Sequence, residues 1–254
     1  MRIDLNADVG ESFGAYAIGH DAGLMKSITS ANVAAGFHAG DPSVLRATIR
    51  TAKAHGVAVG AHPGFPDLVG FGRREMTVSP REAEDFVLYQ IAAVAGVAAA
   101  EGVALQHVKP HGALFNIAMR DAALASGIAR ATAAFNPALL LFGLPGSELL
   151  KAGRAAGLRV VSEAFADRAY EPDGSLVSRS KAGAVLHEEA IVVARAVRLA
   201  RDGEVEAIDG TLLRFRPDTI CVHSDTPGAG DLAARIRLAL DAAGVSVRAA
   251  GGGG

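Results

Sequence analysis

The N-terminal stretch Arg2–Val9 alternates apolar and polar side chains with the two-residue period of a β-strand. One face is apolar, and the other carries Asp4, Asn6 and Asp8. An antiparallel strand with its polar face in water is the common source of such alternation. The alternative is a strand whose polar face lines a polar cavity. This segment alone leaves both interpretations open.

Along the rest of the chain, short apolar segments alternate with helical segments. The predicted strands are 2–9, 29–35, 57–61, 103–109, 138–143, 158–164 and 218–223. The predicted helices are 42–55, 80–101, 121–134, 146–156, 187–202 and 228–243. Strictly alternating strands and helices predict an α/β protein whose parallel sheet is covered by helices, either a barrel or an open doubly wound sheet.

Several helix ends carry clear local signals. Asp41 before Pro42 is a typical N-cap, and Ser79 with Glu82 is a typical capping box. Glycines that can take the left-handed conformation mark four transitions from helix to strand. They are Gly56, Gly102, Gly157 and Gly244.

Two connections, 63–79 and 166–186, are longer than ordinary loops, and such segments are usually lids or binding loops. A third stretch, 206–215, is centred on Asp-Gly and predicts a surface hairpin. Because no linker or low-complexity run divides the chain, we expect one domain over 1–248. A glycine-rich tail, 249–254, follows and is expected to be mobile.

Composition narrows the classes of function. Half of the residues are apolar, 20% are charged, and the formal net charge is −2. Interspersed acids and bases argue against a nucleic-acid or anionic-membrane surface. Cys221 is the only cysteine, so neither an internal disulfide nor a thiolate metal cluster is expected. Without an apolar leader or a run of ~20 apolar residues, the chain is expected to be soluble and cytoplasmic.

Histidines and acids gather where the predicted strands end. They are Asp8, His38, His62, His111, Glu163, Asp167, His223 and Asp225. The carboxyl ends of parallel strands form the face on which active sites assemble in barrels and open α/β sheets. Each residue alone has an ordinary explanation in a loop or a cap, but six strand ends that each supply a histidine or an acid predict an active site. The other histidines, at positions 20, 55, 107 and 187, are interpreted as structural.

Lys109 and His111 flank Pro110 and precede Gly112. The proline favours an extended Lys109, and the glycine permits a tight turn, so both side chains are presented rigidly at one strand end. An inward Lys109 among carboxylates would stay charged and could grip a carboxylate or stabilise an oxyanion. The alternative is a surface lysine in a turn.

The two long connections carry arginines. Arg73 and Arg74 could place a guanidinium over an anion, and a solvated arginine pair is the alternative. Asp167, Arg168 and Tyr170 open the second connection, where an Asp–Arg pair indicates a hinge clamp or the edge of an active site.

A metal site is a second open question. Asp8, His38 and His62 would suit a divalent ion with nitrogen and oxygen ligands. The sequence has no H-x-x-x-H or H-E-x-x-H pair. It also lacks a phosphate loop and a G-x-G-x-x-G turn after a strand, so no nucleotide signature is present.

Six separated motifs resemble one known family. They are DLNADVGE at 4–11, GFHAGD at 36–41, GAHPG at 60–64, HVKPHGAL at 107–114, FADR at 165–168 and CVH at 221–223. On these motifs the chain resembles the LamB/YcsF family, the A subunits of bacterial-type 5-oxoprolinase, up to its glycine-rich tail. The resemblance implies an irregular seven-stranded β/α barrel like that of the glycoside hydrolases and deacetylases.

The resemblance also implies ATP-dependent opening of 5-oxo-L-proline to L-glutamate, performed with partner subunits B and C. ATP is then the expected cofactor, and a divalent metal ion stays an open possibility. Lys109 and His111 are expected to stabilise charge on the lactam oxygen or a phosphoryl group, while Asp8 or His62 acts as the base for water. The substrate pocket is expected to include Asn6, Glu11, His38, Glu163, Asp167, Arg168, His223 and Asp225.

Two other functions remain open at this point. A stand-alone metal-dependent amidohydrolase or carbohydrate deacetylase would act without ATP or partners. A non-catalytic lactam-binding subunit would bind its ligand regardless of His111. In each case a parallel sheet wrapped by helices leaves neither strand face in water, so the polar face of 2–9 is expected to point inward. Buried acids there are costly unless they are paired.

Overall fold

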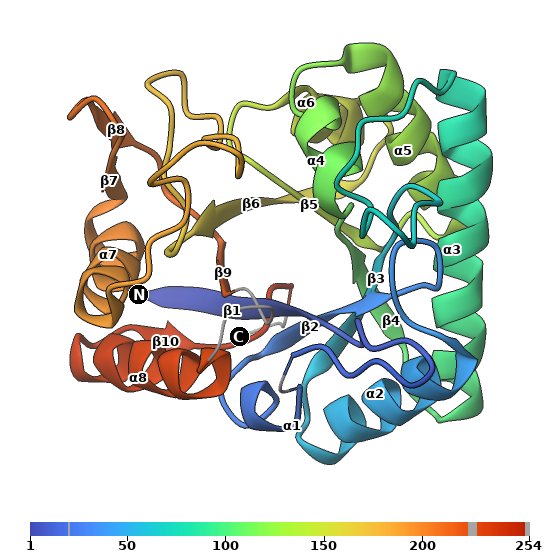
Figure 1. The fold of residues 1–254 in the computed structure, drawn as a ribbon, viewed down its shortest axis with the longest axis horizontal. Coiled ribbons are helices and arrows are strands. Elements are labelled where there is room, and N and C mark those ends of the chain that lie inside the picture. The colour runs from blue at the N-terminus through green and yellow to red at the C-terminus, as the bar shows by residue number, and fades with distance from the viewer. Residues whose placement is uncertain (20, 223–227, 252–254) are drawn as a thin grey trace.

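The structure is a computed structural model that describes residues 1–19, 21–222 and 228–251. Within these residues, seven parallel strands form a closed barrel (Figure 1). They are β1 (Arg2–Val9), β2 (Ser30–Ala34), β3 (Ala58–His62), β4 (Leu105–Val108), β5 (Leu140–Gly143), β6 (Arg159–Phe165) and β9 (Thr219–Val222). The barrel closes because β1 pairs with β2 on one side and with β9 on the other. This confirms the β/α barrel and excludes the open sheet.

Helices surround the barrel, and all six predicted ones are present with ends shifted by one or two residues. They are α2 (Pro42–Ala54), α3 (Pro80–Ala100), α5 (Ala122–Phe135), α6 (Glu148–Ala155), α7 (Glu189–Asp202) and α8 (Ala229–Ala242). The two-residue strand β10 (Ser246–Val247), beside β1, follows Gly244, where a transition from helix to strand is predicted. Two short helices, α1 (Asp21–Leu24) and α4 (Gly112–Ala118), were not predicted. Each is too short to leave a periodic pattern in the sequence.

The local signals act as predicted. Asp41 accepts hydrogen bonds from the backbone of the first turn of α2, and Ser79 with Glu82 forms the capping box of α3. The four glycines at helix ends have φ between 67° and 79°. β7 (Glu204–Glu206) and β8 (Leu212–Arg214) form the predicted antiparallel hairpin.

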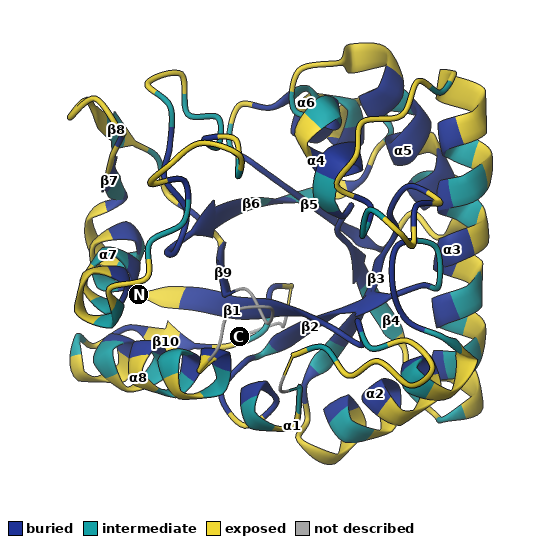
Figure 2. Cartoon of the chain, in the orientation of Figure 1, coloured by how far each residue is buried: buried dark blue, intermediate teal, exposed yellow. Residues whose placement is uncertain are grey.

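β1 passes through the interior of the molecule, and every residue of it after Arg2 is buried (Figure 2). Its apolar residues pack in the core between barrel and helices. Asp4, Asn6 and Asp8 have relative exposures of 1%, 0% and 7% and contact side chains of other barrel strands. The polar face therefore lines the barrel interior and does not face water.

Helix α3 is, in the part of the chain that the structure describes, the one helix long and apolar enough to cross a membrane. One of its faces packs against α5, β3 and β4. On that face, buried Gln90 exchanges two hydrogen bonds with the backbone of Gly64, at 2.9 and 3.0 Å. Helix α3 therefore packs as a helix of the barrel, and its Gln90 anchors the start of the loop 63–79.

Residues 249–251 of the glycine-rich tail are described by the structure, and one of them packs against the barrel. Ala250 is buried in a cluster with Leu140, Phe142 and Val161. Small residues leave little signal of packing in a sequence, which is why the sequence alone predicts a mobile segment here.

Two glycines allow a matched test of how tightly the barrel interior is packed. A Cβ on Gly60 of β3 would lie 2.1 Å from the His107 ring. That ring is held because Nε2 is 2.7 Å from Asn32 Oδ1 and the ring stacks on Phe142 at 4.3 Å. We expect Gly60→Ala to lower the free energy of unfolding by about 1–3 kcal/mol. Gly96→Ala, on α3 with nothing within 4 Å, should raise it by about 0.5–1 kcal/mol. Denaturant unfolding measures both, and effects of equal sign would contradict this packing.

Candidate active site

The polar face of β1 forms three layers along the barrel. The layer nearest the N-terminal end is Asp4, which accepts hydrogen bonds from the hydroxyls of Thr29, Ser30 and Thr219. Burial raises the pKa of Asp4, and the three hydroxyls oppose that rise. Because its oxygens are engaged by other strands, Asp4 stabilises the floor of the barrel.

The middle layer is formed by Asn6. Its amide donates to Glu163 Oε1 at 3.0 Å and to Thr219 Oγ1 at 2.8 Å, and its oxygen accepts from Asn32 at 2.7 Å. Asn32, on β2, also donates to Asp8 Oδ1 at 2.8 Å. Both carboxamides are thus engaged inside the barrel, where they orient the two acids.

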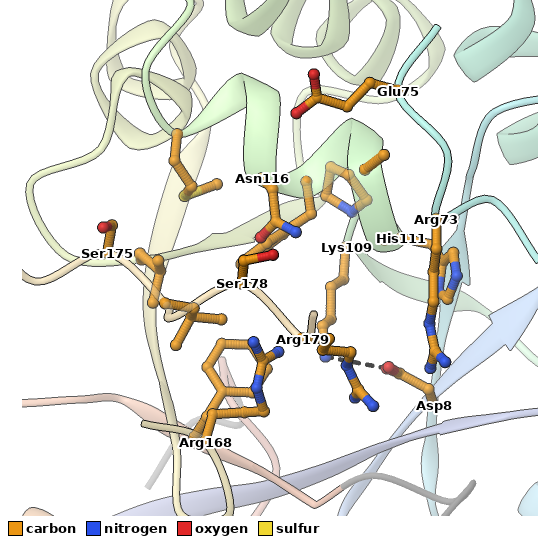
Figure 3. Close-up of a pocket in the computed structure, with 18 of the residues that line it drawn as sticks. Asp8, Arg73, Glu75, Lys109, His111, Asn116, Arg168, Ser175, Ser178 and Arg179 are labelled. Atoms are coloured by element: carbon orange, nitrogen blue, oxygen red, sulfur yellow. Dashed lines mark hydrogen bonds and ion pairs between the residues drawn. The ribbon is translucent and has the colours of Figure 1, made fainter. Parts of the chain in front are cut away.

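Lys109 lies at the centre of the third layer and is 2% exposed. Its Nζ is 2.9 Å from Asp8 Oδ1 (Figure 3). It is also 2.9 Å from Glu163 Oε1 and 3.0 Å from Cys221 Sγ. Burial alone would lower the pKa of Lys109, but the adjacent acids outweigh it and hold that pKa well above its usual range. Burial raises the pKa of the Cys221 thiol, which stays protonated. Lys109 is therefore a fixed cation between two acids.

Three histidines from three strand ends meet beside Asp8. The rings of His38 and His111 stack with centroids 3.8 Å apart, and the ring of His62 is nearly perpendicular to both. Burial, followed by the neighbouring imidazoles, holds the pKa of His38 and of His111 well below the ordinary value. These two rings are accordingly neutral at neutral pH.

Backbone carbonyls determine which nitrogens carry protons in two of these rings. His62 Nδ1 is 2.7 Å from the carbonyl oxygen of Lys109, and His111 Nε2 is 2.8 Å from that of Phe71. Because a carbonyl only accepts, both nitrogens must donate. In neutral rings the remaining nitrogens, His62 Nε2 and His111 Nδ1, then carry lone pairs, and they are 3.0 Å apart. Two lone pairs at this distance require a proton or a cation between them.

Phe71, which supplies one of these carbonyls, has a φ of 55°. This left-handed conformation is rare for a residue other than glycine and costs roughly 1–2 kcal/mol. The Phe71 ring lies nearly perpendicular to those of His38 and His111, at centroid distances of 5.8 and 5.3 Å. The loop 63–79 thus holds a strained residue that orients two histidines.

Glu11 joins the three histidines in a group that we call the Glu–His cluster, in which one potential ligand atom from each residue lies within 4.8 Å of the others. Glu11 Oε1 is 3.9 Å from His111 Nδ1 and 4.0 Å from His38 Nε2. Among the described residues, neither ring nitrogen of buried His38 has a hydrogen-bond partner. An unpaired buried polar group costs about 1–3 kcal/mol.

The Glu–His cluster fits a divalent metal ion, because three imidazoles and one carboxylate are ligands that Zn²⁺ and similar ions take. A bound ion would also satisfy His38 and separate the two facing lone pairs. This set differs from the predicted one of Asp8, His38 and His62. Lys109 and Asn32 engage Asp8 Oδ1, while Asp8 Oδ2 lies 3.4 Å from His62 Nε2, at the edge of the Glu–His cluster.

A cavity of about 370 Å³ opens over the third layer (Figure 3). Six predicted site residues line it: Asp8, Glu11, His62, Lys109, His111 and Arg168. Four others are buried outside the lining: Asn6, His38, Glu163 and Asp167. His223 and Asp225 lie outside the described residues.

Both long loops contribute to the cavity wall. Arg73 from the first and Arg168 and Arg179 from the second line it, whereas Arg74 pairs with Asp67 away from the lining. Sequence reasoning missed Arg179, which lies in a segment without periodicity. It also missed Asn32, although a polar residue within an apolar predicted strand is a usable signal of an inward-facing group.

Comparisons with known proteins support one family. Residues 3–252 match the model of the LamB/YcsF family. The A subunit of 5-oxoprolinase from Tolumonas auensis is 53% identical over 248 residues, which are 98% of this chain and 99% of that protein. The A subunit from Symbiobacterium thermophilum is 55% identical over 250 residues, 98% and 96% of the two chains. The crystal structure of a lactam utilization protein from Thermus thermophilus matches with a TM-score of 0.93 and 52% identity, covering 98% of this chain and 100% of that one.

The charge arrangement around Lys109 predicts the behaviour of a variant. Lys109→Met leaves Asp8 and Glu163 without their shared cation, and we expect a loss of about 3–5 kcal/mol of unfolding free energy at neutral pH. Burial already raises the pKa of Glu163, against the lowering by Lys109, and without Lys109 that pKa rises further. A carboxyl group whose pKa is raised by folding destabilises the folded protein as the pH rises toward that pKa. The loss of unfolding free energy in Lys109→Met should therefore shrink toward pH ~5.

Urea unfolding at the two pH values measures this deficit. Lys151→Met is the control, because Lys151 is exposed and pairs with Glu148 on the surface of α6. Its effect should stay below about 1 kcal/mol. Equal effects of the two substitutions, or a Lys109→Met deficit that is constant with pH, would contradict a buried ion pair.

Proposed function

The chain belongs to the LamB/YcsF family, and on that premise we propose that it is the lactam-opening subunit of an ATP-dependent 5-oxoprolinase, which converts 5-oxo-L-proline to L-glutamate. Relatives at 53% and 55% identity are named as A subunits of 5-oxoprolinase. We further propose that it works in the cytoplasm with ATP and with partner subunits B and C. The absence of a phosphate-loop signature from the sequence suits a chain that relies on partners for nucleotide chemistry.

One observation carries this proposal: a buried, permanently charged Lys109 lies at the cavity floor beside an acid that can move a proton. Asp8 contacts Lys109 through Oδ1 at 2.9 Å and approaches His62 Nε2 through Oδ2 at 3.4 Å. A lactam develops negative charge on its oxygen as water adds to its carbonyl carbon. A fixed cation in a site shielded from water stabilises such charge without reorganisation.

The lactam is a poor electrophile because water must overcome amide resonance. Transfer of the γ-phosphoryl group of ATP to the lactam oxygen gives an imidate phosphate and ADP, in which that resonance is lost. Addition of water to its carbon followed by cleavage of the C–N bond gives γ-glutamyl phosphate. A second water then gives glutamate and inorganic phosphate, so the balance is one ATP and two waters for each lactam.

Asp8 is the residue to which we assign proton movement. It takes a proton from the water that adds to the lactam carbon, and it returns a proton to the ring nitrogen when the C–N bond breaks. His62 is assigned to the Glu–His cluster, because its Nδ1–H is committed to the carbonyl of Lys109 and its Nε2 faces His111. His111 and Glu11 act with it as part of that cluster.

A divalent ion held by the Glu–His cluster would supply Lewis-acid charge next to Asp8. The cluster also favours one alternative function, a metal-dependent amidohydrolase that acts without ATP. The two functions differ in their requirement for ATP and for partner subunits.

The activity of the assembled enzyme tests the proposal. The chain is purified with subunits B and C, and 5-oxoproline-dependent ADP and glutamate formation are measured. We expect Asp8→Asn to lower kcat by at least about 10²-fold, as for loss of an acid–base group. His55→Ala, at an exposed position where Nδ1 is 2.9 Å from the Thr51 carbonyl, should leave kcat unchanged.

Undiminished glutamate formation by Asp8→Asn would remove Asp8 from the mechanism. Turnover of an acetylated sugar by the chain alone, with none of 5-oxoproline by the complex, would overturn the proposed function.

Metal binding is tested separately from activity. We expect the isolated chain to bind one divalent ion, detected by metal analysis and by the absorption spectrum of bound Co²⁺. Glu11→Gln and His38→Ala should each weaken binding by more than the ~10–100-fold typical of losing an outer-shell partner. Asp8→Asn distinguishes the ligand sets, because it should retain the spectrum if Asp8 is not a ligand. Loss of the spectrum in Asp8→Asn but not in Glu11→Gln would restore the set predicted from sequence.

A further inference from the structure

Three arginines from the two long loops line the cavity. They are Arg73, Arg168 and Arg179, and we call them the arginine triad. Figure 3 shows them around the same space as Lys109 and Asp8. The cavity thus has acids and Lys109 at its floor, and its loop wall carries three guanidinium groups together with the Glu75 carboxylate, which pairs with Arg120 at 3.2 Å.

One member of the arginine triad is buried and held by hydrogen bonds, and a second is exposed and lies over an aromatic ring. Arg168 is 5% exposed and donates from Nη2 to the Val177 carbonyl at 2.6 Å and from Nε to the Ala184 carbonyl at 3.2 Å. The guanidinium carbon of Arg73 lies 4.9 Å from the centre of the Phe71 ring. A guanidinium fixed in this way loses little further freedom when it binds a ligand.

The arginines lie close enough to affect one another. Burial, and next the charge of Arg179, lower the pKa of Arg168 to about 10, and Arg73 contributes in the same direction. Arg168 still carries its charge at neutral pH. Converging like charges in a partly buried wall repel one another, and a bound anion converts that repulsion into attraction.

The size and polarity of the wall indicate the class of anion. One carboxylate is satisfied by a single bidentate arginine, whereas a phosphoryl group offers three acceptor oxygens and up to two negative charges. Hydroxyl groups from the second loop line the same wall, at Ser175, Ser178 and Ser180. At about 370 Å³, the cavity lies near the lower end of the ~300–1,000 Å³ range of small-molecule sites, which suits a phosphorylated lactam better than a whole nucleotide.

We propose that the arginine triad binds the phosphoryl group carried on the oxygen of the activated lactam. This inference rests on the proposed function, since that function supplies the phosphorylated lactam. The ring then lies between the triad and Asp8, with its carbon facing the cavity floor. The triad also neutralises the charge of the γ-glutamyl phosphate that forms when the C–N bond breaks.

Calorimetric titration of the isolated chain with inorganic phosphate tests the site at constant ionic strength. We expect Arg73→Gln and Arg179→Gln each to weaken phosphate binding at least about 10-fold, since each removes a charged hydrogen-bond donor. Arg74→Gln is the matched control, because the Arg74 guanidinium pairs with Asp67 and lies outside the lining. Phosphate affinity that is the same in all three variants and in the wild type would overturn the inference.

A non-hydrolysable ATP analogue identifies the source of the phosphoryl group. We expect it to bind the isolated chain more weakly than inorganic phosphate does. An analogue that binds more tightly than phosphate, and loses that affinity in Arg179→Gln, would assign the triad to the nucleotide and overturn the lactam assignment.

The assembled enzyme separates the inference from the proposed function. In the complex with subunits B and C, Arg179→Gln should lower glutamate formation at least about 10-fold while ADP formation falls less, because activated lactam forms but is not held for opening. Wild-type turnover of 5-oxoproline with unchanged coupling in Arg179→Gln would overturn the inference alone. Triad-dependent phosphate binding in a complex that never opens 5-oxoproline would overturn the function and leave the anion site in place.

Discussion

The ion pair of Lys109 with Asp8 and Glu163 is the interaction on which the interior of the barrel depends. Each charge alone would bear a desolvation penalty of several kcal/mol. The three are supplied by β4, β1 and β6 or the residues that follow them, so these groups meet only when the strands are closed into one barrel. The contacts that make the charges tolerable are therefore those that define the fold.

The two polar layers below the ion pair are also held by contacts between strands, here hydrogen bonds of hydroxyl and carboxamide groups. Hydroxyls surround Asp4, and two carboxamides connect Asn6 and Asn32 to the acids above them. Asp4, Asn6 and Asn32 each find a partner on a neighbouring strand, which is the condition for burying them. The outer face of β1 can then be wholly apolar and pack against helices. The alternation in the first strand reflects this division between interior and core.

Much of the fold could be predicted from the sequence because its signals are local. Strand and helix periodicity, caps and helix-end glycines depend on neighbours in the chain, and these elements are predicted with small errors. The arrangement of the site depends on closure of the barrel. His38 stacks on His111, 73 positions away, and Glu11 lies with them in the Glu–His cluster. Nothing local encodes which loop ends meet, and Arg179 shows the same limit for a loop without periodicity.

Lys109 orients both halves of the site through two different atoms. Its ammonium engages Asp8 at 2.9 Å, and its carbonyl accepts from His62 Nδ1 at 2.7 Å. His62 Nε2 is left to face the other members of the Glu–His cluster. Pro110 favours an extended backbone at Lys109, whose side chain and carbonyl contact different partners. In the proposed function, the acid assigned to proton movement and the cluster that fits a metal ion thus lie side by side, and Lys109 contacts one member of each.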